Sequence, residues 1–212
     1  SFYDIAYSAR YRREQHRCGA VLLASSADQA QQKLVDFVEA DQTSVNDSVV
    51  DVVSGQRLVE ARGPVFVYSG NGCQWETMGK SLLGSSEVFR TAVEAVDDYF
   101  QSLADFSLID ELRGNNGSDR FVRTEIAQPA LFAIQVGVTE LLREQGVMPT
   151  AVTGHSVGEV AAAWACGALS LEDAVKVIYH RSRHQGLTQG LGEMTAAGLG
   201  GEAMQSLLDE PR

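Results

Sequence analysis

The spacing of apolar residues predicts a small α+β unit over residues 1–62. A helical period over 26–40 predicts a helix that begins at a polar cap. Short apolar runs at 18–25 and 48–55 predict strands, and a further short helix is expected over 1–14. The apolar face of the helix over 26–40 comprises Leu34, Val35, Phe37 and Val38. This unit shows no obvious chemistry.

The pattern changes at Gly63-Pro64, where strands, loops and helices begin to alternate. The apolar run 64–70 predicts a strand that ends in a glycine-rich loop, and a second strand is expected over 149–156. The helix predicted over 127–146 has Pro129 in its first turn, where a proline removes no helical hydrogen bond. The other predicted elements are a helix from about Glu76, a helix over 85–104, a loop at 114–119, helices over 157–166 and 169–186, and a strand, turn and helix within 192–210. Such alternation indicates an α/β domain with a parallel sheet.

The stretch Gly154-His155-Ser156-Val157-Gly158 lies between a predicted strand and a helix of small residues. In that context a Gly-x-Ser-x-Gly frame is typical of a nucleophilic serine on a sharp turn, because the glycines let two backbones pass closely. The hydroxyl then lies near free N–H groups at a helix N-terminus, and these favour negative charge on a bound acyl oxygen. The alternative interpretation is a serine in a glycine-rich helix cap.

Composition excludes several classes of partner. The chain has 28 acidic residues against 17 Lys and Arg, a net charge of −11, so no nucleic acid is expected. No apolar run approaches the roughly 20 residues of a membrane span, and the polar start lacks the core of a signal peptide. Cys18, Cys73 and Cys166 are far apart and odd in number, which suits a reducing compartment rather than a disulfide framework or a zinc site. We therefore expect a cytoplasmic protein and, without an initiator Met, a piece of a longer polypeptide.

Four stretches in register resemble the acyltransferase domains of type I polyketide synthases, relatives of malonyl-CoA:acyl carrier protein transacylases. They are FVYSGNGCQWETMGKSLL (66–83), RTEIAQPALFAIQVGVTELL (123–142), the Gly-His-Ser-Val-Gly-Glu motif with its small-residue helix, and VIYHRSRHQG (177–186). The resemblance implies an α/β fold with a large acyltransferase subdomain at 63–190. It also implies an α+β ketosynthase–acyltransferase linker at 1–62, and the first strand and helix of a truncated ferredoxin-like subdomain at 191–212.

By this resemblance, Ser156 is the nucleophile. It would form an acyl ester from acyl-CoA and pass the acyl group to the phosphopantetheine thiol of an acyl carrier protein. The implied oxyanion hole consists of the backbone N–H groups of Gln74 and of Val157. Cys73 then needs only to fill space. Asn71 stands where the family often has a second glutamine, and because asparagine tolerates a left-handed backbone, we expect no loss of function.

The resemblance assigns Arg181 to the carboxylate of the acyl group, since a planar guanidinium can bind a carboxylate through two parallel hydrogen bonds. The alternative is an exposed helix arginine, as expected for Arg183. Gln128 is either a hydrogen-bond donor beside the pocket or a structural residue at the start of its helix, and His155 would shape the pocket. Val157 and the stretch 124–128 resemble malonyl-type domains, while methylmalonyl selectivity stays open.

The proton acceptor for the serine, normally a histidine, is not evident in the chain. His16 lies in the expected linker, and His155 cannot readily fold back onto the adjacent Ser156. His180 and His184 are i, i+4 on a helix, and without a third ligand we read them as a solvated or packed pair, not a metal site. The resemblance places the catalytic histidine beyond residue 212. We therefore expect the chain to be incomplete as an acyltransferase and to show little transacylation alone.

The expected partners are malonyl-CoA, an acyl carrier protein, a neighbouring ketosynthase domain and the remainder of the acyltransferase domain, with no cofactor bound by this domain itself. A serine hydrolase would share the serine elbow but would need neither Arg181 nor the loop at Gln74. A non-catalytic scaffold is the third possibility, and the presence of Ser156, Gln74 and Arg181 together speaks against it.

Overall fold

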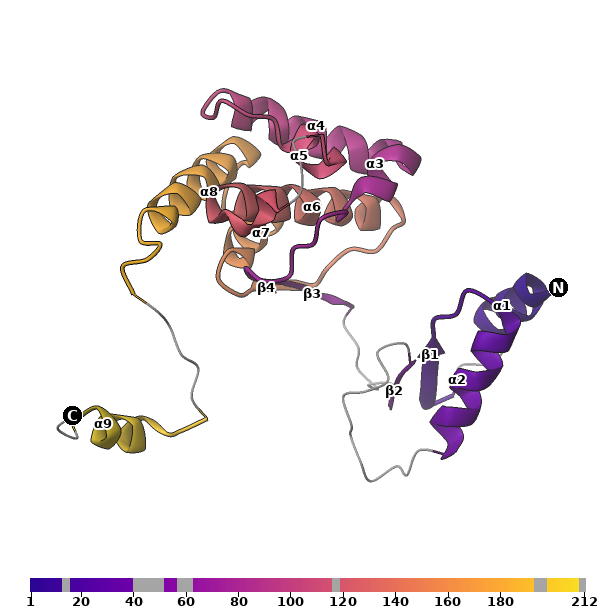
Figure 1. Ribbon diagram of the computed structural model, residues 1–212. Helices are drawn as coiled ribbons and strands as arrows, with labels where there is room; N and C mark the ends of the chain where they lie inside the picture. Colours follow the sequence, from indigo (N-terminus) through magenta and orange to yellow (C-terminus); the bar gives the residue numbers. More distant parts are fainter. Residues whose placement is uncertain (13–15, 40–51, 57–62, 116–118, 193–197, 210–212) are drawn as a thin grey trace. The chain divides into compact units, whose positions relative to one another are not determined.

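The computed structural model describes residues 1–12, 16–39, 52–56, 63–115, 119–192 and 198–209 (Figure 1). The chain divides into two compact units, Ser1–Arg62 and Gly63–Arg212. The division lies where the sequence pattern changes. Among the described segments, no helix combines the length and the apolarity that a bilayer span needs.

In its described residues, the first unit contains two helices and a two-stranded antiparallel sheet. Its elements are α1 (Phe2–Tyr11), β1 (Cys18–Leu22), α2 (Ala27–Glu39) and β2 (Val52–Gln56), with β1 pairing β2 from Cys18↔Gln56 to Leu22↔Val52. The helix predicted over 26–40 is therefore present, and Ser26 Oγ accepts a hydrogen bond from the Gln29 N–H at 3.2 Å at its start. The predicted apolar face is not buried, however: Val38 is 78% exposed, and none of the described residues of α1 or α2 is buried.

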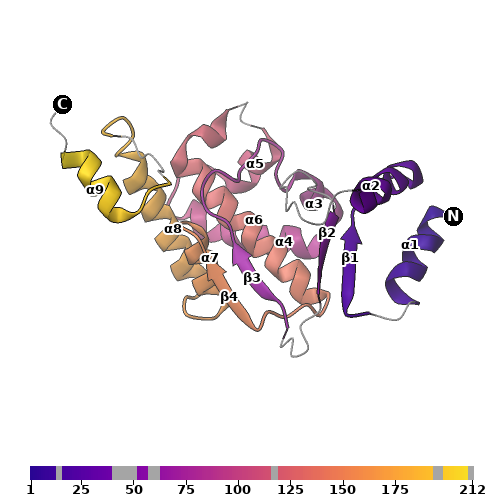
Figure 2. The ribbon, with the colours of Figure 1, turned by 90° about the horizontal axis from the view of Figure 1, so that it is seen from below.

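The second unit is built on a parallel strand pair. Strand β3 (Val65–Tyr68) pairs with β4 (Ala151–Gly154), and Figure 2 shows the two strands side by side. The ladder continues past both strands, because the Thr150 N–H donates to Pro64 O at 2.9 Å and the His155 N–H donates to Tyr68 O at 3.0 Å. The predicted α/β architecture with a parallel sheet is confirmed.

Helices form most of the second unit and supply most of its core residues. They are α3 (Lys80–Ser85), α4 (Glu87–Gln101), α5 (Leu108–Arg113), the 3-10 turn η1 (Arg120–Val122), α6 (Thr124–Glu144), α7 (Gly158–Ala165), α8 (Leu171–Gly186) and α9 (Gly201–Asp209). Helix α6 contacts α4, α7 and α8. It approaches α4 closely at Gly137, where an added Cβ would lie 2.6 Å from the Phe89 ring. The fully buried side chains of Phe89, Phe100 and Phe132 fill the space around α6.

The structure corrects several sequence-based expectations. Pro129 is the sixth residue of α6, not in its first turn, because the helix begins at Thr124, where the Arg123 carbonyl accepts from the N–H groups of Ile126 and Ala127. The helix expected from Glu76 begins at Lys80, after turns. Short helix α5 was not predicted. Residues 116–118, within the loop predicted at 114–119, and 193–197, within the strand and turn predicted near 192, lie outside the described residues.

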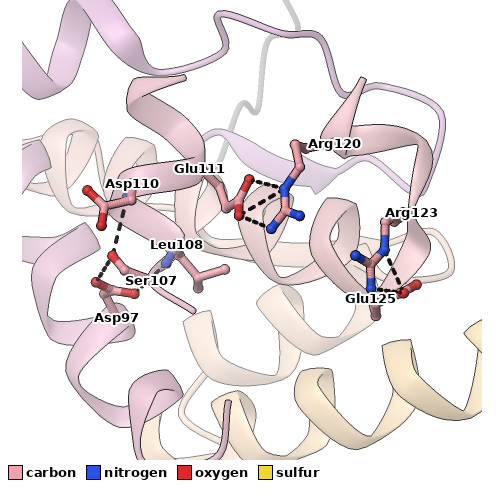
Figure 3. A network of polar contacts seen from close by, with 8 residues as sticks. All are labelled: Asp97, Ser107, Leu108, Asp110, Glu111, Arg120, Arg123 and Glu125. Carbon is pink, nitrogen blue, oxygen red and sulfur yellow. Dashed lines mark hydrogen bonds and ion pairs between the residues drawn. The ribbon is translucent and has the colours of Figure 1, made fainter. Parts of the chain in front are cut away.

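A buried carboxylate links α4 to α5. The Asp97 side chain accepts from the Leu108 N–H at 2.6 Å and from Ser107 Oγ at 2.7 Å (Figure 3). It also accepts from Gln101 Nε2 at 2.8 Å. Ser107 also caps α5 by accepting from the Asp110 N–H. Because Asp97 is only 2% exposed, these donors replace its hydration and hold the start of α5 against α4.

Candidate active site

Ser156 occupies a sharp turn between β4 and α7. Its φ is 55°, the left-handed region that side-chain-bearing residues seldom adopt. The turn is held on both sides of the serine, because the His155 N–H donates to Tyr68 O and the Gly158 N–H donates to His155 O at 2.9 Å. A backbone strained in this way and fixed by its neighbours is typical of a functional residue.

The glycines around Ser156 are required by close backbone contacts. A Cβ added to Gly158 would lie 2.2 Å from Tyr68 O, and one added to Gly154 would lie 2.2 Å from Gly158 O. Gly70, two residues after β3, is also crowded, since its Cβ would lie 2.6 Å from His155 Nδ1 and 3.3 Å from Ser156 Cβ. The Gly-x-Ser-x-Gly frame therefore lets α7 begin directly against the neighbouring strand, and it brings the glycine-rich loop to the serine.

Arg181, on α8, reaches the serine. Its Nη2 donates to Ser156 Oγ at 2.9 Å, while its Nη1 donates to Gln128 Oε1 and, at 3.2 Å, to Gln185 Oε1. All three acceptors are neutral. In the described part of the chain, Arg181 forms no ion pair with an Asp or Glu. A guanidinium therefore lies beside the nucleophile without an acidic partner.

Gln128 joins α6 to the same cluster. Its side chain is fully buried, and its Nε2 donates to Thr124 Oγ1 at 2.7 Å and to Gln185 Oε1 at 2.8 Å. Gln128 is thus an acceptor for Arg181, and its Nε2 donates within its own helix and to α8. The role predicted for it as a donor to substrate stays a prediction. Gln185 was missed by the sequence reasoning. Its place four residues after Arg181 puts both on one face of α8, the only signal that could have found it.

The loop after β3 is anchored from two sides. Gln135 Nε2, on α6, donates to Ser69 O at 2.8 Å where the loop begins. Farther along, the Gln74 side chain accepts from the Gly72 N–H at 2.8 Å and donates to Phe121 O at 3.4 Å. Gly72, with φ 104°, adopts the left-handed region here, so the tolerance expected of Asn71 is not used.

The two backbone N–H groups expected in the oxyanion hole are available. Within the segments that the structure describes, neither the Gln74 N–H nor the Val157 N–H donates a hydrogen bond. Val157 is the N-terminal cap residue of α7 and is fully buried. The Val157 N–H, at the N-terminus of α7 and next to Ser156, forms a suitable environment for developing negative charge. The Cys73 side chain is exposed.

A buried ion pair supports the η1 turn that receives Gln74. Glu111, whose side chain is 1% exposed, accepts hydrogen bonds from the Arg120 guanidinium, as Figure 3 shows. These hydrogen bonds raise the pKa of Arg120 above its ordinary value. Next to the pair is a cavity of about 300 Å³. Its lining includes Gln74, Trp75, Glu111, Arg120 and Phe121.

No histidine of the second unit serves Ser156 in this arrangement. His155 and His184 are exposed, and His180 packs edge-on against the Tyr179 ring. None of the three hydrogen bonds to Ser156 Oγ. Among the described residues no group of three or more His, Cys, Asp or Glu could hold a metal ion. The described residues around Ser156 thus provide a hydroxyl, the Val157 amide and the Arg181 cation.

Comparison with known proteins agrees with this geometry. The model of the acyl transferase domain family matches residues 65–211. The chain belongs to this family. It is 39% identical to erythronolide synthase EryA2 of Saccharopolyspora erythraea over 92% of its own length, which is 5% of that protein. The acyltransferase domain of module 8 of the salinomycin polyketide synthase superposes with a TM-score of 0.66 and 36% identity, covering 87% of this chain and 42% of that one.

A third similarity is to the malonyl-CoA:ACP transacylase of Synechocystis, with a TM-score of 0.53 and 25% identity over 60% of this chain and 41% of that one. The chain therefore spans well under two thirds of each of these proteins. The sequence-based assignment to polyketide synthase acyltransferase domains is confirmed. The family is named for acyl transfer.

Proposed function

We propose that this acyltransferase domain transfers a malonyl group from CoA to the phosphopantetheine thiol of an acyl carrier protein, through an ester on Ser156. One observation carries the choice of acyl group. The Arg181 guanidinium lies 2.9 Å from Ser156 Oγ and has only neutral acceptors. A partly buried cation without a counterion favours an anionic ligand, and a carboxylate matches its planar geometry.

The short distance between the Arg181 guanidinium and Ser156 Oγ also favours a short acyl chain. In a malonyl group, one methylene separates the carboxylate carbon from the thioester carbon, so these carbons lie only about 2.5 Å apart. When the thioester carbon meets Ser156 Oγ, the carboxylate is therefore within reach of the Arg181 guanidinium. A longer diacid would have to fold back. An acyl group without a carboxylate, such as acetyl, would leave the Arg181 guanidinium without an anionic partner.

The chemistry proceeds in two matched halves. Ser156 Oγ attacks the thioester carbon, its proton goes to a base, and the C–S bond breaks to release CoA as the thiol. The carrier's phosphopantetheine thiol then attacks the serine ester, and the C–O bond breaks to restore the hydroxyl. In both halves the Gln74 and Val157 N–H groups would stabilise the tetrahedral oxyanion.

We place the base outside residues 1–212. The support is that His155, His180 and His184 make no hydrogen bond to Ser156 Oγ in the described structure. The remainder of the acyltransferase domain would then supply the proton acceptor.

Malonyl rather than methylmalonyl is proposed from two features. Val157 follows the nucleophile, where methylmalonyl-type domains often carry glutamine, and the stretch 124–128 resembles the malonyl-type motif. Thr124 and Gln128, within that stretch, belong to the hydrogen-bonded cluster around Arg181. This placement supports a role for the stretch in substrate selection.

The remaining proposals concern the setting. The curated relative is a synthase many times longer than this chain. We propose a cytoplasmic multidomain synthase, in which residues 1–62 link a ketosynthase to the acyltransferase and residues 191–212 open a ferredoxin-like subdomain. The domain would hold no cofactor of its own, since the acyl group arrives on CoA and leaves on the carrier.

The test compares Arg181→Ala with Arg183→Ala in the full-length protein. Each is incubated with radiolabelled malonyl-CoA or acetyl-CoA, and label on Ser156 is measured, with Ser156→Ala as the blank. We expect Arg181→Ala to depress malonyl loading about 100-fold more than acetyl loading, because charge-assisted pairs to a carboxylate are strong. Arg183→Ala should load both normally, since in the described structure the Arg183 guanidinium contacts Tyr179, by a hydrogen bond to its hydroxyl and by lying over its ring, and makes no hydrogen bond to Ser156 or to the cluster around Arg181. Equal losses of malonyl and acetyl loading in Arg181→Ala would refute the carboxylate role.

A further inference from the structure

The amide of Gln185 is the meeting point of the cluster around Arg181. Its Oε1 accepts from Gln128 Nε2 at 2.8 Å and from Arg181 Nη1 at 3.2 Å. Gln185 thereby fixes the orientation of the Gln128 amide, whose Oε1 is the other acceptor for Nη1. Gln185 therefore contacts Arg181 directly, and it also orients Gln128, the other residue that accepts a hydrogen bond from Arg181 Nη1.

This arrangement occupies one end of the guanidinium and leaves the other available. Both amide oxygens bond to Nη1, whereas Nη2 bonds only to Ser156 Oγ, and Nε donates to no residue in the described structure. A carboxylate binds arginine through two parallel N–H groups, and the edge formed by Nε and Nη2 provides such a pair. The amides therefore orient Arg181 without using the edge that a substrate needs.

A carboxylate near α8 is paired with another arginine. Glu125 lies beside the last turn of α8, since a Cβ added to Gly186 would be 3.1 Å from its Oε2. Its Oε1, however, accepts from Arg123 Nε at 2.9 Å and from Arg123 Nη2 at 2.7 Å, which Figure 3 shows. The negative charge next to the site is thus paired locally, and the charge of Arg181 stays uncompensated.

We propose that Gln185 is a positioning residue, which seats Arg181 through neutral acceptors so that its full charge is kept for the carboxylate of the acyl group. The inference rests on the proposed function and deepens it. It requires an amide at position 185. A carboxylate one turn after Arg181 would form an intrahelical ion pair and compete with the substrate.

The test is Gln185→Glu, with Gln189→Glu as the matched control. Gln189 lies four residues farther along the chain and makes no side-chain hydrogen bond in the described structure, so its variant adds the same charge without an acceptor for Arg181. Acyl-enzyme formation on Ser156 is measured in the full-length protein over a range of malonyl-CoA and of acetyl-CoA concentrations. We expect Gln185→Glu to raise the KM for malonyl-CoA about tenfold, with acetyl-CoA changed less than about twofold. Gln189→Glu should match the wild type.

A second substitution separates charge from shape. Gln185→Met keeps the length of the side chain but removes the acceptor, so it should lower malonyl loading through misorientation and leave acetyl loading near that of the wild type. Malonyl kinetics unchanged in both Gln185 variants, or equal effects on malonyl and acetyl, would overturn the proposal. If Arg181→Ala is selective against malonyl while Gln185→Glu is not, only this inference fails. If Arg181→Ala affects both substrates alike, the proposed function fails as well.

Discussion

The strain at Ser156 can be measured separately from its chemistry. The residue has φ 55°, where an L-residue with a Cβ is disfavoured and glycine is not. Ser156→Ala and Ser156→Gly both lose the hydroxyl and its hydrogen bond to Arg181. The difference in stability between the two variants therefore isolates the cost of the Cβ in the left-handed region.

The expected size follows from two opposing terms. Removing the Cβ from a residue in the left-handed region raises the free energy of unfolding by roughly 1–2 kcal/mol. The greater conformational entropy of glycine in the unfolded chain lowers it by roughly 0.5–1 kcal/mol. Ser156→Gly should therefore be more stable than Ser156→Ala by about 0.5–1 kcal/mol. For a unit of this size, that difference raises Tm by about 1–4 °C.

Tryptophan fluorescence is a suitable probe, because the two tryptophans of the chain, Trp75 and Trp164, both lie in the unit Gly63–Arg212. Thermal and urea unfolding of that unit can thus be followed without a signal from the first. The matched control is Ser81, an exposed helical residue of α3 without a positive φ. There Ser81→Gly should be less stable than Ser81→Ala, by up to about 1 kcal/mol.

The reasoning is refuted if Ser156→Gly is no more stable than Ser156→Ala while the Ser81 pair behaves as expected. That result would mean that the turn relaxes at no cost and that strain is not built into the elbow.

Two further predictions follow from contacts near the elbow. Gly158→Ala places a Cβ 2.2 Å from Tyr68 O, so we expect a loss of about 1–3 kcal/mol in urea unfolding and little labelling of Ser156 by a serine-reactive probe. Gly84→Ala, with no atom within 4 Å of the added Cβ, is the control and should keep both its stability and the labelling of Ser156. Burial raises the pKa of Tyr68 above its ordinary value of 10.0, and this effect is larger than the lowering of the pKa by the hydrogen bond with Thr139. The unfolded tyrosine ionises first, so this contribution to stability is complete below pH 10.0 and is lost as the pH rises through the folded pKa. The difference in unfolding free energy between the wild type and Tyr68→Phe should therefore shrink above pH 10.0, and a constant difference up to pH 11 would contradict this.

Much of the site was predictable because its rules are local. The glycines at 154 and 158 are required by contacts within a strand–turn–helix, and such contacts are set by residues a few positions apart. The alternation of strands and helices likewise predicted the α/β fold. Boundaries were less secure: the early start of α6 at Thr124 depends on capping by the Arg123 carbonyl, which apolar spacing does not report.

What the sequence by itself predicted was the kind of chemistry: a nucleophilic serine on a turn and, by the match of its motifs to a family, an arginine proposed to bind a carboxylate. Only the tertiary structure decided how that arginine is held. Gln185 and Gln128 are 57 positions apart, and they meet because α6 packs against α8. Apolar packing fixes which helix faces come together, and pairings between polar side chains on those faces follow from that packing. The exposure of the apolar face of α2 could not be predicted for the same reason: periodicity in the sequence shows that an apolar face exists but not which element covers it.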